Sequence, residues 1–123
     1  QYANYTFVDD IKINSRMTLG EDIADLAGTI LAYLGWQVAT EGQALEPRDG
    51  LTPEQRFFVG SAQWACGHET EERSRVLARV SSHSPLRYRV NGVMVNMPEF
   101  ARAFQCKPGD AMYRDPKEVC RIW

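Results

Sequence analysis

The sequence lacks several features that mark specialised classes of protein. Its 14 Lys and Arg residues stand against 16 Asp and Glu residues, so neither sign of charge is in excess. Its longest stretch without a charged residue covers 15 residues, 26–40, and contains two glycines and two threonines, whereas a bilayer span needs about 20 apolar residues. We therefore expect no nucleic acid partner and no membrane contact from this segment.

The chain also lacks an initiator methionine and the basic, then apolar, start of a signal peptide. We expect it to be a mature or excised portion of a longer product. The 123 residues are 44% hydrophobic and 24% charged, which excludes a disordered tail, a collagen-like repeat and a coiled coil. Length and composition fit about one small globular domain.

Cysteine is scarce, and its count is odd. The three cysteines are Cys66, Cys106 and Cys120, and an odd number cannot form a closed set of disulfides within the chain. Either some thiols are free and behave as small hydrophobic side chains, or their partners lie on sequence outside this segment.

The strongest local pattern predicts a helix over residues 19–38. Thr18 followed by Glu21 fits a capping box, and no Lys or Arg occurs in the predicted range. A helix without a charged stripe is usually buried on most sides, so Glu21 and Asp25 are expected to point into protein. Apolar residues recur at helical spacing: Leu19, Ile23, Leu26, Ile30 and Leu34.

The rest of the chain is predicted from shorter signals. Thr52 and Pro53 mark the start of a second helix that ends near Cys66. Residues 86–95 are predicted to be strand-like around an Asn-Gly turn. We further predict helices over residues 70–80 and 97–104, the latter capped by Asn96, a loop with a weak strand over residues 1–17, and a loop-rich tail over residues 105–123.

Glu21 and Asp25 lie four residues apart and so share one face of the predicted helix. One interpretation is structural, because acidic residues near a helix N-terminus are stabilising. The other is a zinc ligand followed by a carboxylate that orients a ligating histidine. The two histidines of such a site must come from elsewhere, because an HExxH motif is absent: the residue four after His68 is Glu72.

His83 and Arg89 also allow two interpretations each. His83 lies in a serine-rich turn, where it either caps the turn at the surface or donates a hydrogen bond to a tetrahedral oxyanion. Arg89 is either a solvated residue on the predicted strand or a forked donor to a substrate carbonyl or carboxylate.

Five segments in fixed order resemble the C-terminal part of the neprilysin/endothelin-converting-enzyme family of zinc metallopeptidases. Together they extend over nearly the whole chain. They are TLGEDIADLAG at 18–28, LTPEQRFFVGSAQWACG at 51–67, HSPLRYRVNG at 83–92, NMPEFARAFQCKPGDAMY at 96–113 and CRIW at 120–123. The resemblance implies that residues 1–123 form the mainly α-helical C-terminal segment of a thermolysin-like (gluzincin) catalytic domain, with the HExxH helix upstream.

The resemblance also implies roles for individual residues. Glu21 matches the family's third zinc ligand, and Asp25 matches the catalytic-site carboxylate that orients a zinc-bound histidine. His83 matches the histidine that stabilises the transition state, and Arg89 matches the arginine that binds a substrate backbone carbonyl. One Zn²⁺ per complete active site is the implied cofactor, and peptides are the implied substrates.

Two positions depart from the family pattern. Asp22 stands where the family more commonly has Asn, in a position that is not a ligand. Trp64 and Ala65 stand where relatives have Val and Trp, so the tryptophan of the substrate pocket is displaced by one residue. Both residues are predicted to contact substrate, with an altered pocket.

The family's cysteines at these positions bond to upstream sequence. The resemblance therefore implies disulfides from Cys66, Cys106 and Cys120 to the upstream part of the same polypeptide, and an extracytoplasmic location: periplasmic, secreted or a membrane-anchored ectodomain. The predicted function is the C-terminal portion of a zinc-dependent metalloendopeptidase acting on small or medium peptides. The alternative is a helical fragment or binding module without activity of its own.

Overall fold

The computed structural model describes residues 1–122, and Trp123 of the CRIW motif lies outside the described residues. The chain is mainly helical, as predicted. The elements, in order, are a 3₁₀ turn at Tyr2–Asn4, β1 (Thr6–Val8), β2 (Ile11–Lys12), α1 (Ser15–Ala39), α2 (Pro53–Gln63), α3 (Glu71–Val80), α4 (Leu86–Met94) and α5 (Pro98–Ala103).

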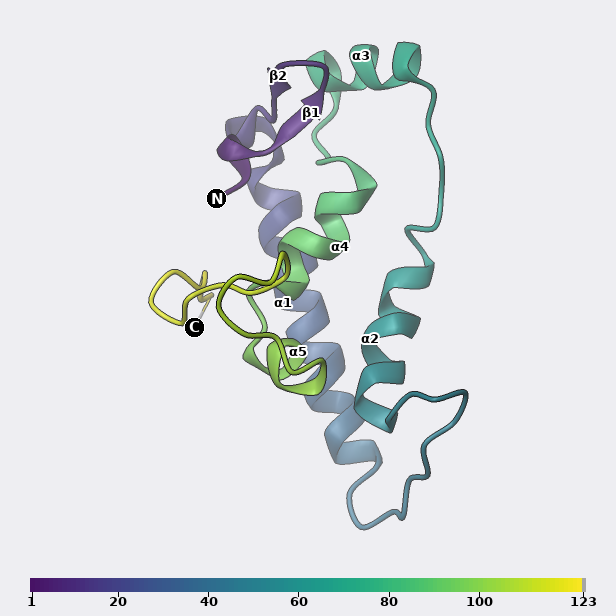
Figure 1. The fold of residues 1–123 in the computed structure, drawn as a ribbon. Coiled ribbons are helices and arrows are strands. Elements are labelled where there is room, and N and C mark those ends of the chain that lie inside the picture. Colours follow the sequence, from purple (N-terminus) through teal and green to yellow (C-terminus); the bar gives the residue numbers. More distant parts are fainter. Residues whose placement is uncertain (123) are drawn as a thin grey trace.

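Helix α1 runs along the length of the molecule, and the other elements are arranged around it (Figure 1). Helix α4 packs on α1, α2 packs on α5, and α3 packs on β1. Strands β1 and β2 form a short antiparallel hairpin, where the sequence predicted only a weak strand. Within residues 1–122, no helix is long and apolar enough to cross a membrane.

The predicted capping box at the start of α1 is wrong. The helix begins at Ser15, with Asn14 as an N-cap that makes no side-chain cap bond. Thr18 therefore lies inside the helix, and its hydroxyl donates to Asp22 Oδ2 at 2.7 Å, one turn later. The Thr-x-x-Glu pattern also fits the interior of a helix, because residues three or four apart meet on one face.

The buried side of α1 is more polar than its apolar stripe predicted. Its buried residues are Thr18, Asp22, Leu26 and Tyr33. Several large apolar side chains are instead exposed in this segment, and those on α1 are Met17, Leu19, Ile23, Leu31, Leu34 and Val38. The expectation that α1 is buried on most sides is therefore not met by residues 1–122 alone.

Helices α2 and α3 start where predicted. Thr52 Oγ1 accepts a hydrogen bond from the Gln55 backbone N–H, and the Gln55 side chain accepts from the Thr52 N–H, which completes a capping box with Pro53 in the first turn. Thr70 Oγ1 accepts from the Arg73 N–H at the start of α3. Helix α2 ends at Gln63, three residues before the predicted end.

The strand predicted over residues 86–95 is wrong, because this segment forms α4. Gly92 lies inside the helix against Tyr2, and a Cβ atom there would lie 2.8 Å from the Tyr2 hydroxyl oxygen. The adjacent Val93 and Met94 are both buried, as helix packing allows and an alternating strand does not. Close approach to Tyr2, not a turn, explains the glycine.

Asn96 was predicted to cap α5, but Met97 occupies the N-cap position. Asn96 is buried instead, and its amide nitrogen donates to the Gly92 carbonyl and to Gln1 Oε1. Its amide oxygen accepts from the Cys120 backbone N–H at 2.9 Å. One side chain thus joins α4 to both ends of the chain.

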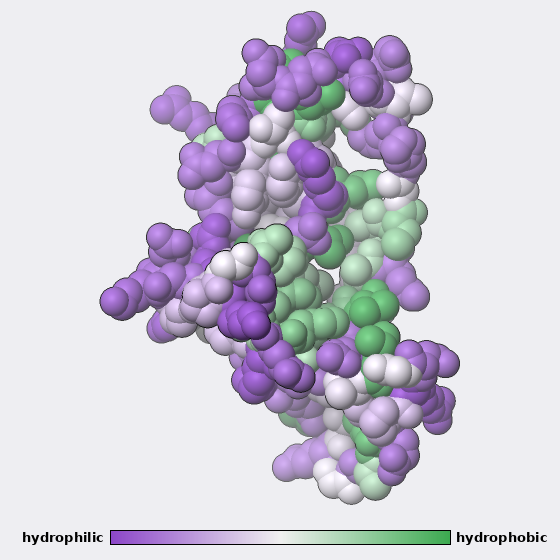
Figure 2. Space-filling model, in the orientation of Figure 1, coloured by the Kyte–Doolittle hydropathy of each residue, from purple (hydrophilic) through white to green (hydrophobic). Residues whose placement is uncertain are grey.

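The core lies where α1, α2, α4 and α5 meet. Phe58 is almost fully buried and contacts the rings of Tyr33, Phe57 and Phe100. Hydrophobic residues also reach the surface over the middle of the molecule, whereas the end that carries α3 is mostly hydrophilic (Figure 2). The helices carry more apolar surface than these residues cover.

We expect Asn96→Ala to reduce the free energy of unfolding by about 1–3 kcal/mol, because the buried Gly92 carbonyl and the Cys120 N–H both lose the side chain that bonds to them. Urea denaturation of the purified protein measures this loss. Asn91→Ala, at an exposed position of α4, is the matched control and should leave stability nearly unchanged. Equal effects of the two substitutions would contradict the proposed bridging role of Asn96.

Candidate active site

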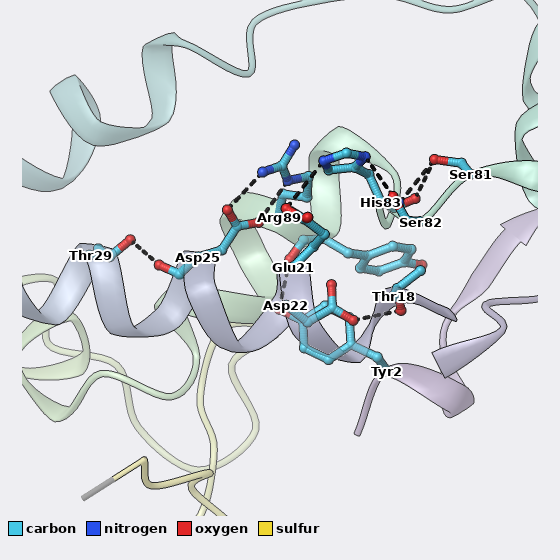
Figure 3. Close-up of polar contacts among 11 residues, drawn as sticks. Tyr2, Thr18, Glu21, Asp22, Asp25, Thr29, Ser81, Ser82, His83 and Arg89 are labelled. Carbon is cyan, nitrogen blue, oxygen red and sulfur yellow. Dashed lines mark hydrogen bonds and ion pairs between the residues drawn. The ribbon is translucent and has the colours of Figure 1, made fainter. Parts of the chain in front are cut away.

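Four of the residues that the sequence singled out lie together at one edge of α1 (Figure 3). Glu21 and Asp25 project from adjacent turns of α1. His83 comes from the turn between α3 and α4, and Arg89 comes from α4. The structure thus brings these four side chains together as two pairs.

The first pair joins Asp25 to Arg89. Arg89 Nε donates to Asp25 Oδ2 at 2.7 Å, and Nη2 donates to Oδ1 at 2.8 Å. The Asp25 side chain is only 15% exposed, and the Arg89 side chain is only 19% exposed. The hydrogen bonds that Arg89 donates to Asp25 raise the pKa of the Arg89 guanidinium, although burial acts against this. This is a forked, charge-assisted contact of the geometry that makes such pairs strong.

Trp64, just after α2, completes the surroundings of Arg89. The guanidinium carbon lies 4.8 Å from the centre of the indole ring, within the range of a cation–π contact. Arg89 is therefore held by an ion pair on one side and by an aromatic ring on another. This arrangement leaves several of its N–H donors free for another acceptor.

A cavity of about 310 Å³ lies beside this pair. Asp25, Gly28, Ser61, Trp64 and Arg89 are among the residues that line it. Ala65 is half-buried just beyond α2 and does not border this cavity. The lining combines polar and apolar side chains.

The second pair joins Glu21 to His83. His83 Nε2 lies 3.2 Å from Glu21 Oε2, and each side chain is nearly half exposed. Ser81 Oγ shapes the turn by accepting from the His83 backbone N–H and donating to the His83 carbonyl. Ser82 Oγ lies 3.4 Å from the other ring nitrogen, Nδ1. The pair thus lies at the surface of this segment.

Asp22 belongs to the same region, although sequence reasoning gave it no role. It is 5% exposed, and burial raises the pKa of its carboxyl, an effect that the hydroxyls of Ser84 and Thr18 partly offset. Asp22 Oδ1 and Ser84 Oγ are both buried without a hydrogen-bond partner. The helical spacing of Thr18 and Asp22 was the available signal, because two polar residues one turn apart on an apolar helix can pair.

Residues 1–122 contain no group of three or more His, Cys, Asp or Glu side chains that could hold a metal ion. This agrees with the missing HExxH motif. Glu21 offers one accessible carboxylate, and carboxylate oxygen is an accepted zinc ligand. The segment therefore fits zinc as the donor of one ligand and not as a complete site.

Cys66, Cys106 and Cys120 are free thiols in this structure. Cys66 and Cys120 are exposed, and Cys106 is half-buried. Cys66 and Cys120 are therefore not buried as small hydrophobic side chains, which was one of the two interpretations of the sequence. Their pairing with upstream cysteines stays a prediction.

We expect Arg89→Met to reduce the free energy of unfolding by about 3 kcal/mol, because it leaves the Asp25 carboxylate largely buried and unpaired. Arg75→Met is the matched control. Arg75 pairs with Asp9 at the surface, where solvent screens the charges, so its loss should change stability little. Urea denaturation of both variants measures the difference, and equal losses would contradict the special role of the Asp25–Arg89 pair.

Comparisons with known proteins identify the family to which the chain is similar. Peptidase family M13 matches residues 1–120. Endothelin-converting enzyme 1 of Cavia porcellus is 41% identical over all of this chain, neprilysin-3 of Drosophila melanogaster is 39% identical over all of it, and neprilysin-1 of Caenorhabditis elegans is 42% identical over 93% of it. The chain spans only 16% of the length of each of these relatives.

Solved structures agree with these matches. The zinc metalloprotease Zmp1 of Mycobacterium tuberculosis, in its open state, superposes on all of this chain with a TM-score of 0.86 at 36% identity. Its inhibitor complex superposes on 99% of the chain with a TM-score of 0.87 at 35% identity. The chain covers 20% of each of those structures. Sequence and fold together confirm the resemblance, and the chain belongs to peptidase family M13.

Proposed function

We propose that this chain is the C-terminal segment of the catalytic domain of a zinc metalloendopeptidase that hydrolyses small or medium peptides. Family membership supports the class of reaction. The observation that carries the assignment is the gathering of Glu21, Asp25, His83 and Arg89 at one edge of α1, where Asp25 pairs with Arg89 and Glu21 contacts His83. The complete polypeptide would supply the remaining groups.

Glu21 is the proposed zinc ligand of this segment. Its carboxylate is 43% exposed, and its contact with His83 Nε2 at 3.2 Å is the one ion-pair contact that it makes within residues 1–122, so it can turn toward a metal at low cost. The other protein ligands would come from the upstream polypeptide, which carries the HExxH helix in this proposal. Zinc, when bound in such a site, supplies a Lewis acid that polarises a carbonyl and makes water more acidic.

Asp25 is proposed to orient a histidine that binds the metal. Each of its carboxylate oxygens accepts one hydrogen bond from Arg89, and each retains a lone pair for another donor. A carboxylate fixed in this way can accept the second ring N–H of a ligating histidine, which sets the direction of the ring. Arg89 thus stabilises the charge of Asp25 without occupying all of its acceptor sites.

Arg89 is proposed to bind a backbone carbonyl of the substrate. Its Nε and one Nη2 proton serve Asp25, and the remaining guanidinium protons are available to another acceptor. Trp64 supports the guanidinium and lines the adjacent 310 Å³ cavity. Trp64 and the adjacent Ala65 are the proposed substrate-binding residues, and of the two Trp64 contacts Arg89.

His83 is proposed to donate a hydrogen bond to the oxyanion that forms during peptide hydrolysis. Its imidazole lies beside Glu21 and is half exposed, so it can face a substrate bound next to the metal. If Glu21 bound zinc, its carboxylate would be a weaker acceptor for the imidazole, and Nε2–H could donate to a substrate oxygen instead. A positioned donor of this kind contributes mainly in the transition state.

The proposal extends to partners and location. The exposed apolar side chains of α1 and the exposed thiols of Cys66 and Cys120 are proposed to contact the upstream part of the same polypeptide. Disulfides from this segment to that part would require an oxidising, extracytoplasmic compartment. Peptides are the proposed substrates.

We expect Glu21→Ala to abolish zinc retention and peptidase activity in the complete polypeptide, because one protein ligand of the metal is lost. Zinc content by atomic absorption, measured after dialysis, gives the result independently of activity. Glu41→Ala, at an exposed position just after α1, is the matched control and should retain one zinc per chain. Stoichiometric zinc in Glu21→Ala would rule out the ligand assignment.

We expect His83→Ala to lower kcat by about 10²–10³-fold with little change in KM, because its hydrogen bond forms mainly in the transition state. Steady-state kinetics on a peptide substrate measure both constants. His68→Ala, at the other, exposed histidine, should leave both constants unchanged. A change in KM alone would instead assign His83 to substrate binding.

A further inference from the structure

Asp22 and Ser84 are buried polar residues for which the proposed reaction has no use. They are 5% and 4% exposed. Asp22 directly follows Glu21 on α1, and Ser84 directly follows His83 in the turn before α4. The two buried side chains therefore lie on the same two chain segments as the Glu21–His83 pair.

Each of these side chains has an oxygen without a partner. Asp22 Oδ1 and Ser84 Oγ are the two buried side-chain oxygens of residues 1–122 that make no hydrogen bond. An unpaired buried polar group is destabilising, so these two oxygens are expected to have a partner in the complete protein. The contact of His83 Nε2 with Glu21 Oε2 at 3.2 Å brings together the two segments that carry Ser84 and Asp22.

The surroundings of Asp22 fix its carboxylate in place. Thr18 Oγ1 donates to Oδ2 at 2.7 Å, which leaves Oδ1 as the free acceptor. Tyr2 lies on the same side of α1 (Figure 3), where its hydroxyl donates to the Tyr88 carbonyl and its ring packs against Gly92. The carboxylate is thus shielded from solvent, and the serine hydroxyl is the donor available to it.

We propose that the Ser84 hydroxyl donates to Asp22 Oδ1 in the assembled active site, and that this Asp22–Ser84 pair positions His83 by holding its turn against α1. Both are positioning residues that act through His83. The inference rests on the proposed peptidase function.

The other contacts of the turn explain why such a connection is needed. Ser81 bonds to His83 within the turn and to Leu77 at the end of α3, so these bonds do not join the turn to α1. The Glu21–His83 contact would be weakened if the Glu21 carboxylate also bound a metal. The Asp22–Ser84 pair then remains beside His83 as a connection to α1, where a shift of about 1 Å in a reacting group can cost 10²-fold in rate.

The test uses the complete polypeptide with its zinc content measured for every variant. Ser84→Ala and Asp22→Leu remove the donor and the acceptor, respectively, and each should lower kcat about tenfold with KM and zinc content unchanged. Asp22→Asn keeps an acceptor for Thr18 and a polar partner for Ser84, so it should restore kcat to within about threefold of the parent. Ser74→Ala, in α3, is the matched control for loss of a serine hydroxyl.

A double variant distinguishes a working pair from two unrelated defects. If the two side chains act through one hydrogen bond, Ser84→Ala combined with Asp22→Leu should be no slower than the slower single variant. Multiplied effects of the two substitutions would overturn the proposal.

Three further results would overturn it. The first is an unchanged kcat in Ser84→Ala. The second is a lower melting temperature with unchanged kcat per zinc-loaded molecule, which is what a merely structural role predicts. The third is loss of zinc in Asp22→Leu or Ser84→Ala, because the pair would then position Glu21.

Failure of the peptidase function itself is distinguishable, since the unsubstituted polypeptide would lack zinc and activity. If Asp22→Leu does not fold, Ser84→Ala and Asp22→Asn decide the question.

Discussion

The forked ion pair between Asp25 and Arg89 is the interaction on which the candidate site depends. It joins α1 to α4 through two short hydrogen bonds between side chains that are mostly buried. Trp64 adds a third element by stacking on the guanidinium. Because α4 is fixed against α1 in this way, the turn that precedes it places His83 beside Glu21. The four polar side chains therefore meet as a consequence of helix packing.

The sequence predicted the parts of this arrangement that depend on local chemistry. The starts of α2 and α3 follow from Thr52 and Thr70, whose hydroxyls bond to backbone groups a few residues away. The shared face of Glu21 and Asp25 follows from helical geometry alone. The roles of individual residues came from family resemblance, and they stay proposals.

The parts that could not be predicted depend on contacts between distant residues. Residues 86–95 combine apolar residues with an Asn-Gly pair, which locally indicates a hairpin, yet Tyr2 packing on Gly92 and the burial of Val93 and Met94 favour a helix. The sequence did not predict the pairing of Arg89 with Asp25 for the same reason, because a strand over residues 86–95 gives no reason for the Arg89 side chain to contact α1. Asp22 was given no role because the covering of its side chain depends on how α4 and the residues before α1 pack on this helix, although its helical spacing from Thr18 was a signal that the two could pair.

The account's central claim is that the acidic edge of α1 binds a metal whose other protein ligands lie on upstream polypeptide. A crystal structure of the complete polypeptide, with anomalous diffraction recorded at the zinc absorption edge, tests this most directly. The account predicts one zinc peak about 2.0–2.2 Å from a carboxylate oxygen of Glu21, with Asp25 hydrogen-bonded to a ligating histidine. A zinc ion bound elsewhere, with Glu21 still paired to His83, would contradict it.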